Sequence, residues 1–208
     1  LNLGTEFGFR NAQTTVIAPT GTIGLVMNCD TTGVEPSFSL VQFKSLAGGG
    51  MLKIINNGVK LALSELGYDD NQIDEIESYV MGSKSIEGCS SISRERLMKA
   101  GFGEAEFAMI EDSIGAAYDI RGAFNVNTLG TDFCKDVLGL NQNQIDNPFF
   151  DVLKHIGFTS NEIDSGNDYV FGRMTIEGAP HLKDEHLAEF DCATPCCKYG
   201  DRTISWPA

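Results

Sequence analysis

The turn Pro19-Thr20-Gly21-Thr22-Ile23 is the stretch of the sequence with the most specific chemistry. Pro19 fixes one backbone φ angle, Gly21 allows a ligand to approach the main chain, and the hydroxyls of Thr20 and Thr22 flank a predicted helix start. Successive N–H groups at a helix N-terminus point toward one spot, where the helix dipole favours negative charge. The turn therefore predicts a phosphate site without Lys or Arg, with an ordinary capped turn as the alternative.

A second group of reactive side chains is the cluster Cys192, Cys196 and Cys197, with His181 and His186 upstream. Thiolates and imidazoles are the ligands of tetrahedral zinc sites, so a metal site is one interpretation. The cluster lacks the second Cys-x2-Cys pair that makes such a site specific. Redox-active thiols are a second interpretation, and buried unreactive thiols are the interpretation that the spacing favours.

The other polar residues predict structure rather than catalysis. The three histidines assemble into no Ser-His-Asp arrangement, and acid pairs such as Glu75 with Glu77 are typical of a solvated helix face. Cys29, Cys89 and Cys134 are expected to be small buried apolar residues. A hydrolase is therefore not supported.

The elements that position the phosphate turn are expected to be short strands. The sequence predicts a buried strand over Thr14–Ala18, which leads into Pro19. Apolar and polar positions alternate over Phe38–Phe43, which predicts a second strand. Gly48–Gly50 predicts a loop or hinge, because three glycines fit poorly inside a helix or strand. From Met51 onward the pattern is helical.

An internal repeat organises the helical part. Residues 66–88 match residues 156–178 at an offset of 90 residues without a gap, and residues 100–114 form a looser third copy. Asp69 and Thr159 each stand three residues before a Gln or Glu, which is the spacing of a capping box. The repeat predicts antiparallel helix hairpins ended by glycine, and its shared residues are those that packing requires.

Composition excludes several classes of partner. Fifteen Lys and Arg against 29 Asp and Glu give a net charge of −14, so neither nucleic acid nor an anionic membrane surface is an expected partner. No apolar stretch approaches the roughly 20 residues that span a bilayer. Six cysteines without a regular pairing pattern favour a reducing, cytoplasmic compartment. Both ends read as cut edges, so we expect a piece of a longer protein.

Several segments carry a family resemblance and follow one another through nearly the whole chain. They are Arg10-Asn11-Ala12-Gln13, Ala18 to Ile23, Cys29 to Pro36, Leu46 to Gly50, Phe124-Asn125 with Thr128-Leu129-Gly130, Tyr169 to Thr175, Glu177 to Lys183, and Phe190 to Ala193 with Pro195-Cys196. Together they resemble the adenosylcobalamin (vitamin B12)-dependent, class II ribonucleotide reductases. Cys197 departs from the family pattern, which has glycine there.

The resemblance implies a fold that is α/β and helix-rich: a partial segment of the ribonucleotide reductase ten-stranded α/β barrel with a helical-hairpin insertion. Residues 1–47 would be the barrel segment with the phosphate loop, 48–178 the hairpin insertion, and 179–208 a return segment toward the barrel. Because most strands of the barrel would lie upstream, we expect a helix-rich chain with a few strands near its ends.

The resemblance also implies a function. Such enzymes convert ribonucleotides to 2′-deoxyribonucleotides with a cysteine thiyl radical that adenosylcobalamin initiates, and Pro19 to Ile23 would bind the diphosphate of a ribonucleoside di- or triphosphate substrate. The segment Gly33–Pro36 would lie near the same site. The family's catalytic cysteine motifs do not occur here, so no catalytic residue is assigned to this chain, and a homodimer of the full-length enzyme is left open. The alternative is a non-catalytic helical protein-interaction module.

Overall fold

The computed structural model describes residues 2–11, 15, 17–45 and 51–205. The chain divides into two units, residues 1–37 and residues 38–208, which are described separately. The glycines 48–50, predicted to form a loop, lie outside the described residues.

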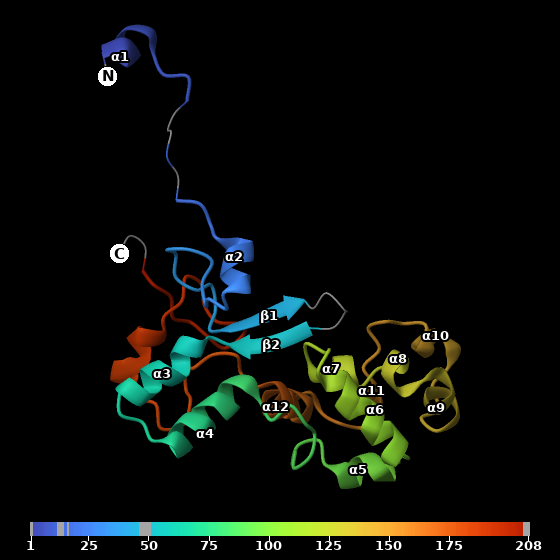
Figure 1. The fold of residues 1–208 in the computed structure, drawn as a ribbon. Helices are drawn as coiled ribbons and strands as arrows, with labels where there is room; N and C mark the ends of the chain where they lie inside the picture. Colours follow the sequence, from blue (N-terminus) through green and yellow to red (C-terminus); the bar gives the residue numbers. More distant parts are fainter. Residues whose placement is uncertain (1, 12–14, 16, 46–50, 206–208) are drawn as a thin grey trace. The chain divides into compact units, whose positions relative to one another are not determined.

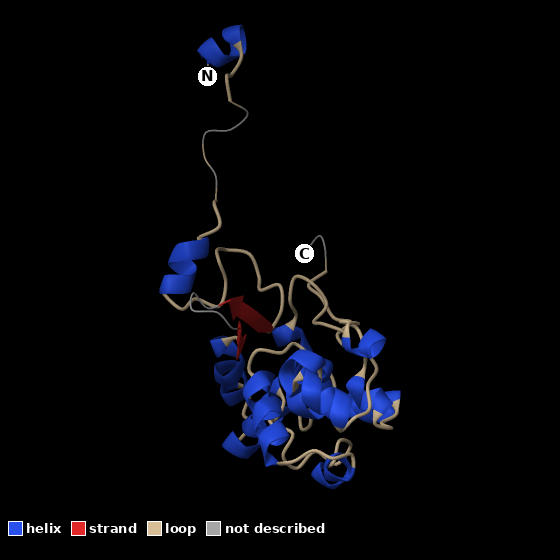
Figure 2. Cartoon of the chain, turned by 90° about the vertical axis from the view of Figure 1, so that its right-hand side faces the viewer, coloured by secondary structure: helices blue, strands red, loops and turns tan. Residues whose placement is uncertain are grey.

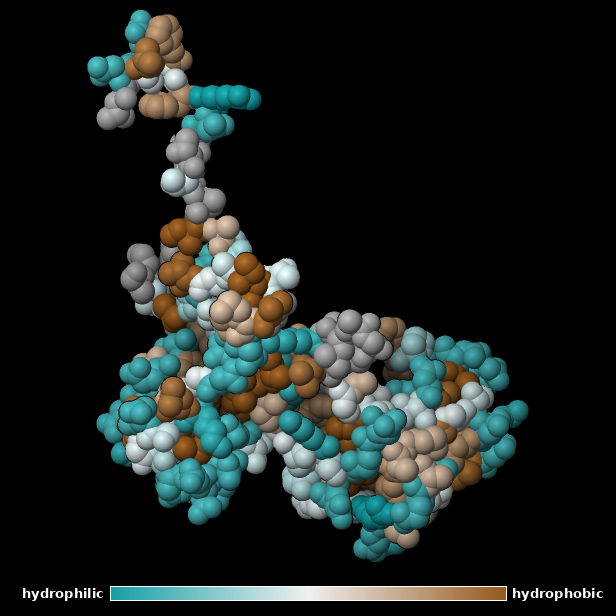
Figure 3. Space-filling model, viewed as in Figure 1, coloured by the Kyte–Doolittle hydropathy of each residue, from teal (hydrophilic) through white to brown (hydrophobic). Residues whose placement is uncertain are grey.

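The first unit contains two short helices, α1 (Asn2–Phe7) and α2 (Gly21–Val26). Helix α2 begins directly after the Pro19-Thr20 turn, as predicted. Large apolar side chains of this unit are exposed, among them Ile17 at 80% and Val26 at 82% (Figure 3). Such side chains normally pack against other protein, so this unit presents an apolar surface.

The predicted strand Thr14–Ala18 is not formed over its described part. Residues 15, 17 and 18 belong to neither a helix nor a strand, and the other two residues lie outside the described part of the chain. A strand requires a neighbour for its backbone N–H and C=O groups, and β1 and β2 are the only paired strands among the described residues. The β-branched composition was therefore insufficient to predict a strand.

The second unit opens with a β-hairpin of β1 (Val41–Ser45) and β2 (Met51–Ile55). The strands are antiparallel, with Val41 opposite Ile55. The second predicted strand, Phe38–Phe43, therefore begins three residues later than expected, and the prediction of helix from Met51 was wrong for its first five residues. Apolar runs this short fit either element, and here strand pairing decides. These are the only strands among the described residues, so the ten-stranded barrel is not present in them.

The rest of the second unit is helical, and Figures 1 and 2 show the helices from two directions. The elements are α3 (Asn57–Glu65), α4 (Asp70–Met81), α5 (Arg94–Lys99), α6 (Glu104–Ile114), α7 (Ile120–Ala123), α8 (Val126–Leu129), α9 (Thr131–Asp136), α10 (Gln142–Ile145), α11 (Val152–His155), α12 (Ser160–Phe171) and the 3-10 helix η1 (Asp184–Phe190). None of the helices described in the structure has the length and apolar character needed to cross a bilayer.

The predicted repeat is confirmed by its helix caps. Helices α4 and α12 stand at equivalent places in the two copies, and each starts with a complete capping box. The Asp69 carboxylate accepts the Gln72 N–H at 2.9 Å, and the Thr159 hydroxyl accepts the Glu162 N–H at 3.3 Å. Both helices end at a glycine, as the sequence predicted.

The two copies cross each other at these terminal glycines, Gly82 and Gly172. Their backbones have φ and ψ of 76° and 171°, and of 67° and 173°, a region essentially reserved for glycine. A Cβ on Gly82 would lie 2.4 Å from the Gly172 nitrogen, and a Cβ on Gly172 would lie 2.4 Å from the Gly82 nitrogen. Only glycine therefore allows the two chains to pass.

Hydrogen bonds across the crossing are exchanged in matched pairs. The Ser83 N–H donates to the Tyr169 carbonyl at 2.8 Å, and the Arg173 N–H donates to the Tyr79 carbonyl at 3.0 Å. The Tyr79 hydroxyl donates to the Glu177 carbonyl at 2.9 Å, and the Tyr169 hydroxyl donates to that of Glu87 at 2.8 Å. Each bond has its counterpart 90 residues along the chain, so the copies are related by a local pseudo-two-fold axis.

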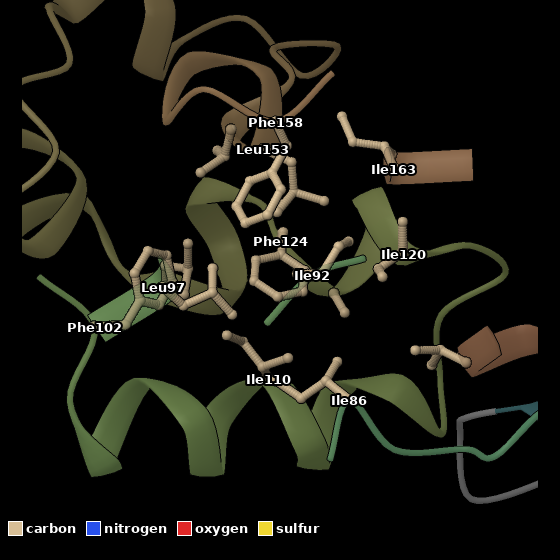
Figure 4. Close-up of a cluster of buried hydrophobic side chains, with 14 of the residues drawn as sticks. Ile86, Ile92, Leu97, Phe102, Ile110, Ile120, Phe124, Leu153, Phe158 and Ile163 are labelled. Atoms are coloured by element: carbon tan, nitrogen blue, oxygen red, sulfur yellow. The ribbon is translucent and has the colours of Figure 1, made fainter. Parts of the chain in front are cut away.

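Because the chains cross, the second half of each repeat copy packs in the core of the other copy. Helices α3 and α4 build one core with residues 176–196, whereas residues 86–97 join α11 and α12 in the other core. Figure 4 shows the latter core, in which Phe124 is 1% exposed and lies among Ile92, Ile110 and Leu153. Neither copy therefore completes a core by itself.

One lysine binds both helix ends. Lys53 on β2 donates to the carbonyl of Met81 at 3.0 Å and to the carbonyl of Phe171, the last residues of α4 and α12. A cation suits this place, because helix C-termini carry partial negative charge. Burial, with the nearby Lys84, lowers the pKa of Lys53 to about 8.

Candidate functional site

The predicted phosphate turn is closed by Thr20. Its hydroxyl donates to the Thr32 carbonyl at 2.9 Å, and its backbone N–H donates to the same oxygen. Its own carbonyl accepts the Gly24 N–H at 2.6 Å, which begins the hydrogen-bond ladder of α2. Thr20 is therefore the residue that shapes the turn, and its amide is engaged within the chain.

The next three residues leave their amides open. The backbone N–H groups of Gly21, Thr22 and Ile23 have no acceptor among the described residues, as is usual in the first turn of a helix. Pro19 has no N–H, so it serves only to direct the chain. Of the five residues predicted to hold phosphate, three thus present donors to a ligand.

The segment Gly33–Pro36, expected near this turn, starts beside it. A Cβ on Gly33 would lie 3.8 Å from the Pro19 Cα, and the Thr31 hydroxyl donates to the Gly33 carbonyl at 3.0 Å. Glu35 is exposed. The sequence analysis missed that the Thr32 carbonyl anchors Thr20. A contact between residues twelve positions apart leaves no periodic signal in the sequence.

Basic side chains are absent from the sequence around the turn. Residues 11–43 contain no Lys or Arg, whereas Asp30 and Glu35 are acidic. An anion bound here by this segment would depend on backbone amides and hydroxyls. Such a site is possible in principle, because amides at a helix N-terminus bind phosphate without a counter-charge.

The C-terminal cysteines separate into a buried pair and an exposed thiol. Cys192 is 2% exposed and Cys196 is 5% exposed, while Cys197 is exposed. Hydrogen bonding from the Cys192 thiol lowers the pKa of Cys196 to about 6, and the same contact raises the pKa of Cys192. Elsewhere Cys89 and Cys134 are buried as predicted.

Cys29, in contrast, is exposed, so its prediction as a buried residue was wrong. It follows α2 in the first unit, which buries few side chains.

The structure does not support the metal interpretation. His186 Nδ1 lies 2.7 Å from the Tyr68 hydroxyl, and His181 Nε2 lies 2.7 Å from a Glu75 carboxylate oxygen. Across the described part of the chain, no three His, Cys, Asp or Glu side chains are grouped as metal ligands would be. Redox chemistry and simple burial thus remain for the buried pair.

Comparison with known families decides the class of protein. A family model described as the ribonucleotide reductase barrel domain matches residues 2–106, half of the 208 residues, and the match includes the phosphate turn. The chain belongs to the ribonucleotide reductase barrel domain family. Membership favours the reductase interpretation over that of a separate helical interaction module.

Individual reductases extend the similarity to the whole chain. A vitamin B12-dependent ribonucleotide reductase of Bradyrhizobium diazoefficiens is 53% identical over 205 residues, and one of Agrobacterium fabrum is 50% identical over 205 residues. Both alignments cover 99% of this chain and 16% of the relative. A reductase of the same name from Rhodopirellula baltica is 58% identical over 97 residues, which are 47% of this chain and 9% of the relative. The chain therefore spans about one sixth of the length of the first two relatives.

Proposed function

We propose that this chain is a segment of a vitamin B12-dependent ribonucleotide reductase, an enzyme that converts ribonucleotides to 2′-deoxyribonucleotides. The observation that carries the proposal is the 53% identity, over 99% of the chain, with a relative of that name. In this proposal residues 1–47 belong to the catalytic barrel, residues 48–178 form a helical insertion, and residues 179–208 return toward the barrel.

Within the proposed enzyme, the turn Pro19–Ile23 binds the diphosphate of the substrate. Three open amides, at Gly21, Thr22 and Ile23, support this role. The lack of basic residues in this segment agrees with binding by main-chain donors, each of which contributes on the order of 1.5–3 kcal/mol when its acceptor is charged. The two bonds from Thr20 to Thr32 would hold the donors in place before substrate arrives.

Adenosylcobalamin would supply the full-length enzyme with the radical that starts the reaction. The described residues do not fit a site for this cofactor. A histidine nitrogen could coordinate cobalt, but all three histidines already have a hydrogen-bond partner in the protein. His155 contacts the Leu138 carbonyl, His181 contacts the Glu75 carboxylate, and His186 contacts the Tyr68 hydroxyl. We therefore assign no step of the radical chemistry to this chain.

The test removes one amide from the turn of the full-length enzyme. Gly21→Pro deletes an N–H at the first position of α2, where proline is well tolerated, and Gly21→Ala keeps that N–H. A Cβ on Gly21 meets no atom within 4 Å, so both variants should fold. We expect KM for the nucleotide to rise about tenfold or more in Gly21→Pro and less in Gly21→Ala, because a charged acceptor loses one donor.

Thr131→Ala, an exposed position at the start of α9, is the matched surface control and should leave KM unchanged. Equal KM values in Gly21→Pro and Gly21→Ala would contradict the role of the amides. An absence of ribonucleotide reduction by the unmodified full-length enzyme with adenosylcobalamin would contradict the proposed function itself.

A further inference from the structure

A cavity of about 340 Å³ lies in the second unit, where the β1–β2 hairpin meets the end of α6 and the crossing of the two repeat copies. Small-molecule sites are typically cavities of about this size, with apolar walls and a few polar groups that fix the ligand. The walls here are mainly apolar and are built by Phe43, Leu52, Met81, Tyr118, Val170 and Phe171. The cavity is therefore suited in size and character to a small molecule with an apolar body.

Lys53 brings a positive charge to this cavity. Two of its N–H groups donate to the carbonyls of Met81, at 3.0 Å, and of Phe171. An ammonium has three N–H groups, and the third has no acceptor in the part of the chain that the structure describes. Because Lys53 lines the cavity, this third donor can bond to a group placed there.

Lys84 is a second cation in the lining of the cavity. Within the described ranges, neither Lys53 nor Lys84 forms an ion pair with a carboxylate. The chain has 29 acidic and 15 basic residues, so carboxylates outnumber cations overall. Two lysines without carboxylate partners in one cavity favour an anion as the ligand.

The repeat shows that the crossing itself does not require a lysine at position 84. The counterpart of Lys84, 90 residues along the chain, is Met174, and both have a φ of 58°. Their N–H groups donate across the crossing to the Val170 and Val80 carbonyls, at 2.9 and 3.0 Å. Met174 packs against both cores, whereas Lys84 is exposed and lines the cavity. The positive charge therefore belongs to the cavity and not to the crossing.

Two acidic residues limit the charge that a ligand can carry. Glu111 and Asp112 also line the cavity. The Glu111 carboxylate accepts bonds from the Ser85 hydroxyl and the Ile86 N–H, both at 3.0 Å, and Asp112 is exposed. Their negative charges would repel a second charge on the ligand, so a monoanion fits better than a phosphate.

Two aromatic side chains of the lining are in contact. The Phe43 and Tyr118 ring centroids are 5.3 Å apart, and the rings are inclined by 50°. Aromatic rings prefer offset or edge-to-face contacts with further rings, so this pair favours an aromatic body. We propose that the cavity binds an aromatic monocarboxylate, with its carboxylate at Lys53 and Lys84 and its ring against Phe43 and Tyr118. This site goes beyond the proposed reductase function and does not depend on it.

The test is isothermal titration calorimetry of the full-length protein with 2-naphthoate. The uncharged 2-naphthamide has nearly the same shape and is the control compound. We expect one site per chain for 2-naphthoate and an affinity for 2-naphthamide that is about tenfold or more lower, because the amide lacks the charge that the two ammonium groups would meet.

Matched variants locate the site. Lys84→Met introduces the residue of the equivalent repeat position and should weaken 2-naphthoate binding about fivefold, as expected for an exposed charge. Lys135→Met, at an exposed position of α9 outside the lining of the cavity, should leave the affinity unchanged.

The volume of the cavity is tested at Gly115, which lines it. Gly115 has a φ of −60°, and a Cβ there would meet nothing within 4 Å, so a side chain is compatible with the fold. Gly115→Phe should fill part of the cavity and remove most of the binding, whereas Gly115→Ala should retain it.

Three results would overturn the proposal. They are an absence of binding at about 1 mM 2-naphthoate, equal affinities for 2-naphthoate and 2-naphthamide, and an unchanged affinity in Lys84→Met. The Lys84→Met and Gly115→Ala variants keep every core side chain, so the proposal can be tested even if Gly115→Phe does not fold. Calorimetry requires no turnover, so its outcome is separate from that of the reductase assay.

Discussion

The substitution Gly82→Ala should strongly destabilise the second unit. The φ of 76° with ψ of 171° costs a residue with a side chain about 1–3 kcal/mol. The new Cβ would also lie 2.3 Å from the Val170 carbonyl oxygen and 2.4 Å from the Gly172 nitrogen, and relieving such overlap typically costs about 1–3 kcal/mol more. The free energy of unfolding should therefore fall by about 3 kcal/mol or more, which lowers the Tm by about 6–12 °C.

Urea denaturation followed by circular dichroism measures this loss. Gly67→Ala is the matched control, because Gly67 also has positive φ, at 88°, but its Cβ would meet nothing within 4 Å. It should cost about 1 kcal/mol. Gly172→Ala should match Gly82→Ala, and the double variant should cost less than the sum, because both side chains would enter the same contact. If Gly82→Ala lowered the free energy of unfolding no more than Gly67→Ala does, the close crossing of the two chains would be refuted.

Further predictions concern the same unit. Tyr79→Phe and Tyr169→Phe each remove one hydrogen bond to a carbonyl, so each should lower the free energy of unfolding, measured by urea denaturation, by about 1 kcal/mol. The loss should be smaller at the more exposed Tyr169. A loss of stability in only one of the two variants would argue against the symmetry. Ile92→Ala, at a side chain with 0% exposure, should cost about 2–5 kcal/mol, and a cost near zero would mean that this core is not packed as described. The pKa of Lys53 is lowered from 10.5 to about 8. Between pH 8 and pH 10.5 the unfolded state therefore binds more protons than the folded state, and the free energy of unfolding should rise with pH. Lys53→Met should lack this rise, and identical pH profiles of stability for the two proteins would contradict the lowered pKa.

The helix caps and the repeat could be predicted from the sequence because their signals are local. A capping box needs residues three apart, and a glycine at the end of a helix is visible at a single position. The equivalence of residues 66–88 and 156–178 was likewise readable from identity at a fixed offset. What the repeat could not reveal was the exchange of segments, because hydrophobic periodicity records that a face is buried and not which copy buries it.

The predictions of the strands were wrong for a related reason. Thr14–Ala18 and Met51–Ile55 both contain apolar and β-branched residues, yet among the described residues only Met51–Ile55 forms a strand. Pairing depends on a partner that the local sequence does not name. The phosphate turn was located correctly before α2, and its role stays a prediction, whereas the dependence of the turn on Thr32 required coordinates.

The crossed arrangement of the two copies has a consequence during synthesis. Helices α3 and α4 leave the ribosome early, but the apolar partners that complete their core, from Ile176 to Cys196, are translated only near the end of this segment. Until then the early helices expose a face rich in isoleucine and valine to solvent. Nascent chains stalled before Ile176 should thus be the species that chaperones hold.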